Sequence, residues 1–205
     1  MHISEGVLSL PVLVSGAALA VAGTAVGLKK LDYESIPQVA VLSAAFFVAS
    51  LVHVPIGPSS VHLILNGLMG LLLGWVAFPA ILVGLLLQAI LFQYGGLTSL
   101  GVNTVVMSLP AVICFIIFRP GVKRGKSGVY LAAFLCGFGA VLLGSLLVAL
   151  ALVCTGKPFF GVAKVVLLAH FPVMVIEGII TAVCVKFLKK VRPEILEVVY
   201  ADSKS

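Results

Sequence analysis

The sequence predicts an all-α integral membrane protein with about seven transmembrane helices, its N-terminus outside the cell and its C-terminus in the cytoplasm. Of the 205 residues, 61% are hydrophobic and 10% are charged, and the mean hydropathy is +1.27. Soluble domains are about 45–50% apolar and about 25% charged. The chain divides into apolar runs of roughly bilayer length, with basic residues at their ends. We therefore expect a single transmembrane domain over residues 1–205.

A transmembrane helix needs about 20 mostly apolar residues. Seven runs meet or approach this length: Val7–Leu28, Ile36–Val54, Val61–Val76, Pro79–Tyr94, Asn103–Phe118, Val129–Cys154 and Gly161–Leu188. The third and fourth runs are short and are joined through Ala77-Phe78-Pro79. A cytoplasmic tail of about residues 189–205 is expected after the last helix.

The orientation follows from Lys and Arg, because short cytoplasmic segments carry an excess of basic residues. With the N-terminus outside, Lys157 and Lys164 are the basic residues that fall on the outer side, out of 13 in the chain. The net charge of +6 thus reflects membrane topology, and we expect no nucleic-acid partner. The sequence contains neither a Walker A motif nor an HExxH motif, so it predicts no ATPase or zinc hydrolase activity of its own.

The first two residues, Met1 and His2, bring a free amine, a backbone nitrogen and an imidazole into one dipeptide. If the amide of His2 deprotonates, these three nitrogens can close fused chelate rings around one metal ion. A fourth nitrogen would complete a planar site, which suits Ni(II) or Cu(II). The competing interpretation is a frayed, solvated terminus. Glu5 lies where a signal peptide would be basic, so we expect no cleaved signal. Glu5 could also orient His2 as an outer hydrogen-bond acceptor.

Two histidines bracket a loop between the second and third runs. His53 begins the loop and His62 ends it, and Pro55, Gly57 and Pro58 between them predict a fixed, non-helical path. His62 is the candidate for the fourth nitrogen. His53 is a metal ligand, an outer partner of one, or an interfacial side chain. For both histidines, a purely structural role is the alternative.

The last apolar run contains His170 and Glu177, which are seven residues apart and so share one helix face. A carboxylate inside the membrane costs at least about 2–3 kcal/mol and is a functional-site hypothesis by default. Glu177 either neutralises a cation, orients a ligand histidine or satisfies helix–helix hydrogen bonds. A different class of function, a proton-coupled secondary metal transporter, would use Glu177 and His170 to exchange protons.

A glycine-rich segment, residues 93–103, follows the fourth run. Gly95, Gly96 and Gly101 suit a turn or a close backbone approach. The segment either caps a binding pocket or simply connects two helices.

Taken together, these features resemble the CbiM/NikM family, the substrate-specific membrane (S) components of energy-coupling-factor (ECF) transporters for nickel and cobalt. The resemblance covers nearly the whole chain and rests on four motifs. These are the start Met1-His2-Ile3-Ser4-Glu5-Gly6, the loop ending Ser59-Ser60-Val61-His62, the stretch Leu87-Gln88-Ala89-Ile90-Leu91-Phe92, and Gly95-Gly96-Leu97-Thr98-Ser99-Leu100-Gly101-Val102-Asn103. The late Ala169-His170 with Glu177 also fits.

The resemblance implies that the N-terminal segment 1–6 inserts into the helix bundle and binds Ni²⁺ or Co²⁺ as substrate. It implies ligation by the Met1 amine, the backbone nitrogen and imidazole of His2, and the imidazole of His62. We expect supporting roles for a further set of residues: Glu5, His53, Ser60, Asn103, His170 and Glu177.

The same resemblance implies a transporter subunit and not an enzyme, in a prokaryotic cell membrane and without an organic cofactor. Its implied partners are a transmembrane coupling (T) subunit, two cytoplasmic ATPase subunits and often a small accessory membrane protein. Cobalt members often carry Ser-His-Pro-Thr-Gly after the loop, whereas this chain continues from Ser60 and Val61 into His62 and Leu63. That departure favours nickel, with cobalt next.

Overall fold

The computed structural model describes residues 2–51, 53–56, 59–123, 128–156 and 160–196. The α-helices of this part of the chain are α1 (Leu10–Lys29), α2 (Ile36–Ala49), α3 (Asn66–Leu73), α4 (Ala77–Phe92), α5 (Leu100–Lys123), α6 (Val129–Thr155) and α7 (Phe160–Val191). Two short 3-10 helices are η1 (Tyr33–Ser35) and η2 (Gly74–Val76). Strands β1 (His53–Ile56) and β2 (Ser59–His62) form one antiparallel ribbon. The predicted helical class is confirmed, apart from this ribbon.

Five stretches of the described chain are long and apolar enough to cross a membrane. They are Leu10–Lys29, Asn66–Phe92, Leu100–Val122, Val129–Thr155 and Gly161–Val191. The outward faces of these helices carry largely exposed apolar side chains, such as Leu10, Val21 and Leu168, which suits contact with lipid. The molecule is therefore a multi-pass membrane protein, as predicted.

The structure corrects two predicted spans. The run Ile36–Val54 is not one helix, because α2 ends at Ala49 and the chain continues as β1. The run Val61–Val76 is not a helix from its start, because β2 occupies its first residues and α3 begins at Asn66. Backbone pairing of His53 with His62 holds these residues extended. The non-helical path predicted for this loop is confirmed, and its form is a ribbon.

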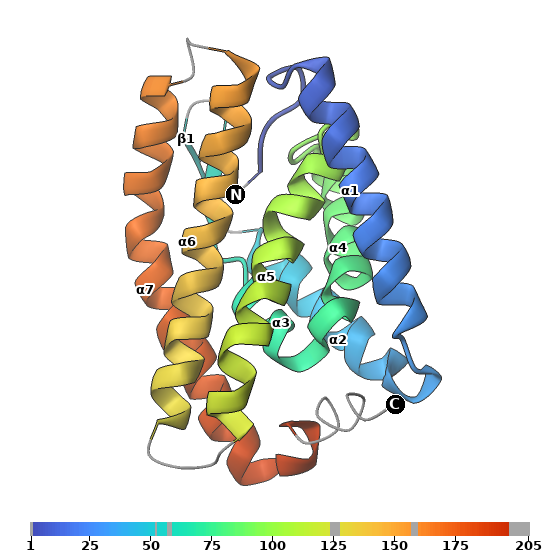
Figure 1. Cartoon of the computed structure of the whole chain (residues 1–205), viewed down its shortest axis with the longest axis vertical. Coiled ribbons are helices and arrows are strands. Elements are labelled where there is room, and N and C mark those ends of the chain that lie inside the picture. Colours follow the sequence, from blue (N-terminus) through green and yellow to red (C-terminus); the bar gives the residue numbers. More distant parts are fainter. Residues whose placement is uncertain (1, 52, 57–58, 124–127, 157–159, 197–205) are drawn as a thin grey trace.

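The helices pack through small residues, as is usual in membranes. In Figure 1, α6 and α7 run side by side, α5 lies in the centre and α1 lies on the far side from α7. A Cβ atom on Gly137 of α6 would lie 2.5 Å from both the Glu177 carbonyl oxygen and Thr181 Oγ1 of α7. Another on Gly67 of α3 would lie 2.6 Å from the Gly137 Cα. Helices α3, α6 and α7 are thus in backbone-to-backbone contact below the ribbon.

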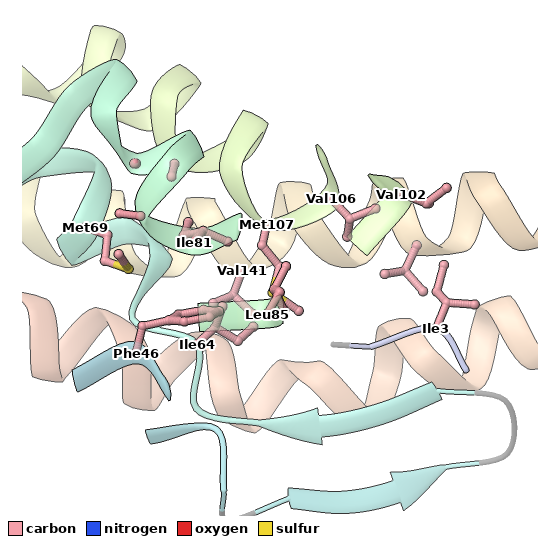
Figure 2. Packing of buried hydrophobic residues seen from close by; sticks show 14 of the residues in the cluster. Ile3, Phe46, Ile64, Met69, Ile81, Leu85, Val102, Val106, Met107 and Val141 are labelled. Carbon is pink, nitrogen blue, oxygen red and sulfur yellow. The ribbon is translucent and has the colours of Figure 1, made fainter. Parts of the chain in front are cut away.

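The N-terminal segment belongs to the hydrophobic core. Ile3 is fully buried in the same cluster as Phe46, Ile64 and Met107. Figure 2 shows Ile3 near the ribbon, at the opposite end of this cluster from Phe46. In Figure 1 the chain before α1 turns back from the upper end of the bundle into its interior. Residues 2 and 3 are therefore packed inside the bundle and do not fray into solvent.

Candidate metal centre

Asn103 on α5 holds the N-terminal segment in place through the backbone of Ile3. Its Oδ1 accepts a hydrogen bond from the Ile3 N–H at 2.9 Å, and its Nδ2 donates to the Ile3 carbonyl at 3.1 Å. Both Ile3 and Asn103 are buried, so this reciprocal pair satisfies main-chain groups that cannot reach water. His2, the next residue toward the terminus, is consequently carried into the interior and is only 3% exposed.

The glycine-rich loop surrounds this contact. Asn103 Nδ2 also donates to Ser99 Oγ at 3.2 Å, and the Ser99 hydroxyl donates to the Gly95 carbonyl at 2.7 Å. Gly95 has φ +77°, and a Cβ there would lie 2.7 Å from Asn103 Nδ2 and 3.6 Å from His2 Nδ1. The loop therefore packs directly against His2, which favours the first of its two predicted roles, a cap, over that of a simple connector.

Glu5 ties the same loop to the N-terminal segment. Its Oε1 accepts a hydrogen bond from the Thr98 N–H at 3.1 Å. This main-chain donor lowers the pKa of Glu5, because it stabilises the ionised carboxylate. A Cβ on Gly96, which has φ +96°, would lie 2.7 Å from Glu5 Cβ. Glu5 thus fixes the N-terminal segment against residues 96–98.

His2 meets His62 in the interior. The two imidazole rings are stacked, with centroids 4.6 Å apart and an angle of 24° between their planes. The ring of Tyr94 lies 6.3 Å from His2, a contact that sequence analysis missed. The position of Tyr94, immediately before the Gly95-Gly96 turn, was the sequence signal that could have suggested this contact. His62 is as deeply buried as His2, at 3% exposed.

The two ring nitrogens of His62 have different surroundings. Its Nδ1 lies 2.7 Å from the Leu63 carbonyl oxygen, which can only accept, so Nδ1 carries the proton and donates. The lone pair is therefore on Nε2, which is buried and has no hydrogen-bond partner among the described residues. Burial, followed by the charges of neighbours that include His2 and His170, lowers the pKa of His62 and keeps the ring neutral. A neutral imidazole with one nitrogen held by a carbonyl is the usual form of a metal-ligating histidine.

His170 and Glu177 lie on α7 and bind main-chain groups. His170 is fully buried, and its Nδ1 donates to the Val166 carbonyl at 2.7 Å. Glu177 is fully buried too, and its Oε1 accepts hydrogen bonds from the backbone N–H groups of Ile64 and Leu65. The two residues are about 10 Å apart along the helix axis, from a rise of about 1.5 Å per residue. Glu177 thus contacts the segment that follows His62.

Three predicted site residues have side chains that the structure does not place. Met1 lies outside the described residues. His53 and Ser60 lie in the ribbon, opposite His62 and Pro55 respectively, but only their backbone positions are described. Across the described residues, no three His, Cys, Asp or Glu side chains form a group that could hold a metal ion.

Comparison with known proteins identifies the family of the chain. The family model of CbiM, the cobalt uptake substrate-specific transmembrane region, matches residues 2–195. A putative metal transport protein of Haemophilus influenzae is 44% identical over 201 residues, covering 96% of this chain and 97% of that protein. Cobalt transport protein CbiM of Kyrpidia tusciae is 34% identical, covering 96% of this chain and 86% of that protein.

Nickel proteins are related as well. The fused nickel transport protein NikMN of Rhodobacter capsulatus is 31% identical, covering 96% of this chain and 64% of that protein. A crystal structure of a transition metal transporter superposes on the whole of this chain and on all of its own, with a TM-score of 0.77 and 25% identity. The resemblance noted in the sequence is therefore confirmed: the chain belongs to the CbiM family of membrane proteins, which transport cobalt or nickel.

Proposed function

We propose that this protein is the substrate-specificity component of an ECF-type transporter and binds Ni²⁺, with Co²⁺ as the second choice. The ligands are the Met1 amine, the deprotonated backbone nitrogen of His2, the His2 imidazole and Nε2 of His62. The observation that carries the proposal is the buried pair of imidazoles, 4.6 Å apart, with the free lone pair of His62 in the interior. Histidine nitrogens bind such metals at about 2 Å, so both rings can reach one ion.

Substrate binding in this scheme is coupled to the docking of the N-terminal segment. The cation arrives from the outer face, where the orientation predicted from the basic residues places the N-terminus. Binding releases protons from the terminal ammonium and from the His2 amide. Asn103 and Glu5 then hold the ordered segment in place through Ile3 and Thr98. The planar, nitrogen-rich geometry favours nickel over the oxygen-preferring divalent ions.

The energy for transport comes from partner proteins in this proposal. The chain has 205 residues, most of them in apolar helices, and no Walker A motif. A transmembrane coupling subunit and two cytoplasmic ATPase subunits would supply ATP-driven movement, with a small accessory membrane protein as a further candidate partner. The C-terminus lies in the cytoplasm in this arrangement.

The test compares protein with its native N-terminus, checked by intact mass, with protein extended by two alanines before Met1. A single added residue would place the histidine third, where the terminal tripeptide alone chelates Ni²⁺, so two are used. The longer extension moves the amine away, so calorimetric nickel binding and the absorption band of bound Ni²⁺ should both be lost. Two alanines added at the C-terminus are the matched control and should change neither. His62→Ala should also abolish high-affinity binding. Nickel binding that survives the N-terminal extension would overturn the chelate.

The alternative function is proton-coupled secondary transport through Glu177 and His170. These are the buried ionisable residues of α7, but each holds a main-chain group. Liposomes containing the purified protein without partners separate the two functions. The proposal predicts no nickel transport under an imposed proton gradient, whereas transport that Glu177→Gln abolishes would favour the alternative.

A further inference from the structure

The carboxylate of Glu177 reaches the proposed metal centre through a single peptide group. Its Oε1 accepts the N–H of Ile64 and, at 2.8 Å, the N–H of Leu65. The Ile64 N–H belongs to the same peptide group as the Leu63 carbonyl. That carbonyl in turn accepts the Nδ1–H of His62 at 2.7 Å. The chain of contacts thus runs from Glu177 through the Leu63–Ile64 peptide to the ring of His62.

The backbone at this point has a conformation that needs support. Leu65 has φ 54° and ψ 14°, the left-handed region that a residue with a branched side chain seldom adopts. This residue ends the extended path from β2 and precedes the first turn of α3. The bend turns two consecutive N–H groups toward α7, and one carboxylate oxygen accepts both. Glu177 therefore fixes the position of the bend, and with it the residue three positions earlier, His62.

The packing around Glu177 keeps it from moving away. Its own carbonyl oxygen is pressed against Gly137 of α6, as is Thr181 Oγ1 one turn later. Gly137 is in turn pressed against Gly67 at the start of α3. The helix that carries the carboxylate and the helix that begins with its hydrogen-bond donors are thus held at a fixed spacing.

We propose that Glu177 is a positioning residue of the metal centre, acting on His62 through a carboxylate–peptide–imidazole relay. The inference rests on the proposed function, because it takes His62 as a ligand. Carboxylates commonly hydrogen-bond the ligating imidazole directly, which fixes its tautomer and makes it a better donor. Here one peptide group lies between them. Hydrogen bonds in such a chain polarise each other, by about 10–30% per bond in condensed-phase estimates.

The relay makes a prediction for the metal-free protein. Glu177 should hold His62 in the Nδ1–H tautomer, and ¹⁵N NMR of histidine-labelled protein distinguishes the protonated from the unprotonated ring nitrogen. His62→Ala assigns the signal. In Glu177→Ala the peptide is released, so the ¹⁵N signals of His62 should move toward those of a mixture of tautomers. In Glu177→Gln a neutral oxygen can still accept both N–H groups, so the shift should be in the same direction and smaller.

Nickel affinity gives the second measurement. Loss of such an outer partner typically weakens metal binding by about 10–100-fold, and we expect this for Glu177→Ala. Glu177→Gln should lose less. Ser108→Ala is the control, since Ser108 is buried on α5 and its hydroxyl has no partner among the described residues. It should change neither the His62 signals nor the affinity.

The outcomes separate the relay from the proposed function. Unchanged His62 signals in Glu177→Ala, or in Glu177→Gln if the alanine variant does not fold, would overturn the relay. Unchanged nickel affinity in both variants would overturn it as well. Wild-type nickel affinity in His62→Ala would instead overturn the proposed function. In that case the NMR comparison of metal-free wild type and Glu177→Ala would still test whether the hydrogen-bonded relay exists.

Discussion

Two arms of the chain meet at the candidate centre, and different helices hold them by different chemistry. The N-terminal arm, residues 2–6, is held by the neutral amide of Asn103 on α5, which gives one hydrogen bond to Ile3 and accepts another. The ribbon arm, residues 53–65, is held at its end by the Glu177 carboxylate on α7, which accepts two. Asn103 both accepts from and donates to the extended backbone at Ile3, whereas Glu177 only accepts, from two consecutive N–H groups at a bend.

The difference indicates which arm can move. Undocking the N-terminal arm leaves the Asn103 amide without partners, whereas releasing the ribbon arm would leave the buried Glu177 carboxyl group without its two donors and the left-handed bend at Leu65 without support. The ribbon arm also continues directly into α3, which is packed against α6 through Gly67 and Gly137. We therefore expect His62 to be a fixed part of the bundle and His2 to be the part that docks when metal binds.

Removing the N-terminal anchor should have the largest effect. Asn103→Leu keeps the volume but leaves the N–H and C=O of Ile3 without partners, at about 1–3 kcal/mol each when buried. The arm should undock, so nickel binding should be lost and residues 2–6 should exchange amide hydrogens rapidly. The melting temperature of the metal-free protein should fall as well, because Ile3 leaves the hydrophobic core.

Ser108→Ala is the control for that variant, because Ser108 is buried on the same helix and its hydroxyl has no partner among the described residues. It should bind nickel as the wild type does. Retention of wild-type affinity by Asn103→Leu would show that the N-terminal arm does not depend on this anchor.

Overpacking the contact behind the ribbon arm should come next. Gly137→Ala places a methyl group 2.5 Å from the Glu177 carbonyl oxygen and from Thr181 Oγ1. Such overpacking costs about 1–3 kcal/mol, and thermal unfolding in detergent should report it as a lower melting temperature. Gly161→Ala on the same pair of helices meets no atom within 4 Å and is the control. Equal melting temperatures for the two variants would contradict the close contact.

Crowding the loop around His2 should have a smaller, local effect. Gly95→Ala forces an L side chain into the left-handed region, at about 1–2 kcal/mol, and also meets Asn103 Nδ2 at 2.7 Å. Nickel affinity should fall by about 5–30-fold, as that energy implies. Gly6→Ala has nearly the same φ, +76°, with no atom within 4 Å, so it carries the strain alone. If both variants lose the same affinity in a nickel titration, the contact with Asn103 contributes nothing.

The smallest effect is a pH dependence of the metal-free protein. Burial lowers the pKa of His62 below its ordinary value of about 6.5, so the unfolded chain binds more protons than the folded one at acid pH. The burial of His62 should therefore lower the free energy of unfolding as the pH falls below about 6.5. Above that pH it should contribute no pH dependence. Melting temperatures of wild type and His62→Gln, compared between about pH 5 and 8, should differ in slope only at the acid end. Parallel curves would contradict this.

Much of the fold could be predicted from the sequence, because lipid imposes long apolar helices. The starts of α6 and α7 fall within one residue of the predicted runs at Val129 and Gly161. Hydropathy failed at α2 and α3, because apolar residues in a buried extended segment look the same as those in a helix. Pro55 and Gly57 predict the non-helical path after α2, but they lie too far beyond Ala49 to account for the end of that helix. The late start of α3 has a tertiary cause, because Glu177 of α7 binds the N–H groups of Ile64 and Leu65.

The residues of the candidate site could be proposed from the sequence, but the contacts between them could not. His2, His62 and Asn103 were proposed because their motifs resemble a family and because histidine is a common ligand. Spacing could not reveal that Asn103 binds the Ile3 backbone, 100 residues away, or that Glu5 binds Thr98. The role of Glu177 was left between three alternatives, and its contact with main-chain N–H groups favours the one in which it orients a ligand histidine.

The most direct test of the central claim is a crystal structure of nickel-loaded protein with its native N-terminus, with anomalous data collected at the nickel edge. The account predicts one strong anomalous peak about 2 Å from nitrogens of both the His2 imidazole and His62 Nε2, with main-chain and terminal nitrogens completing the site. A peak beside His170 or Glu177 with His2 displaced from the bundle would contradict it.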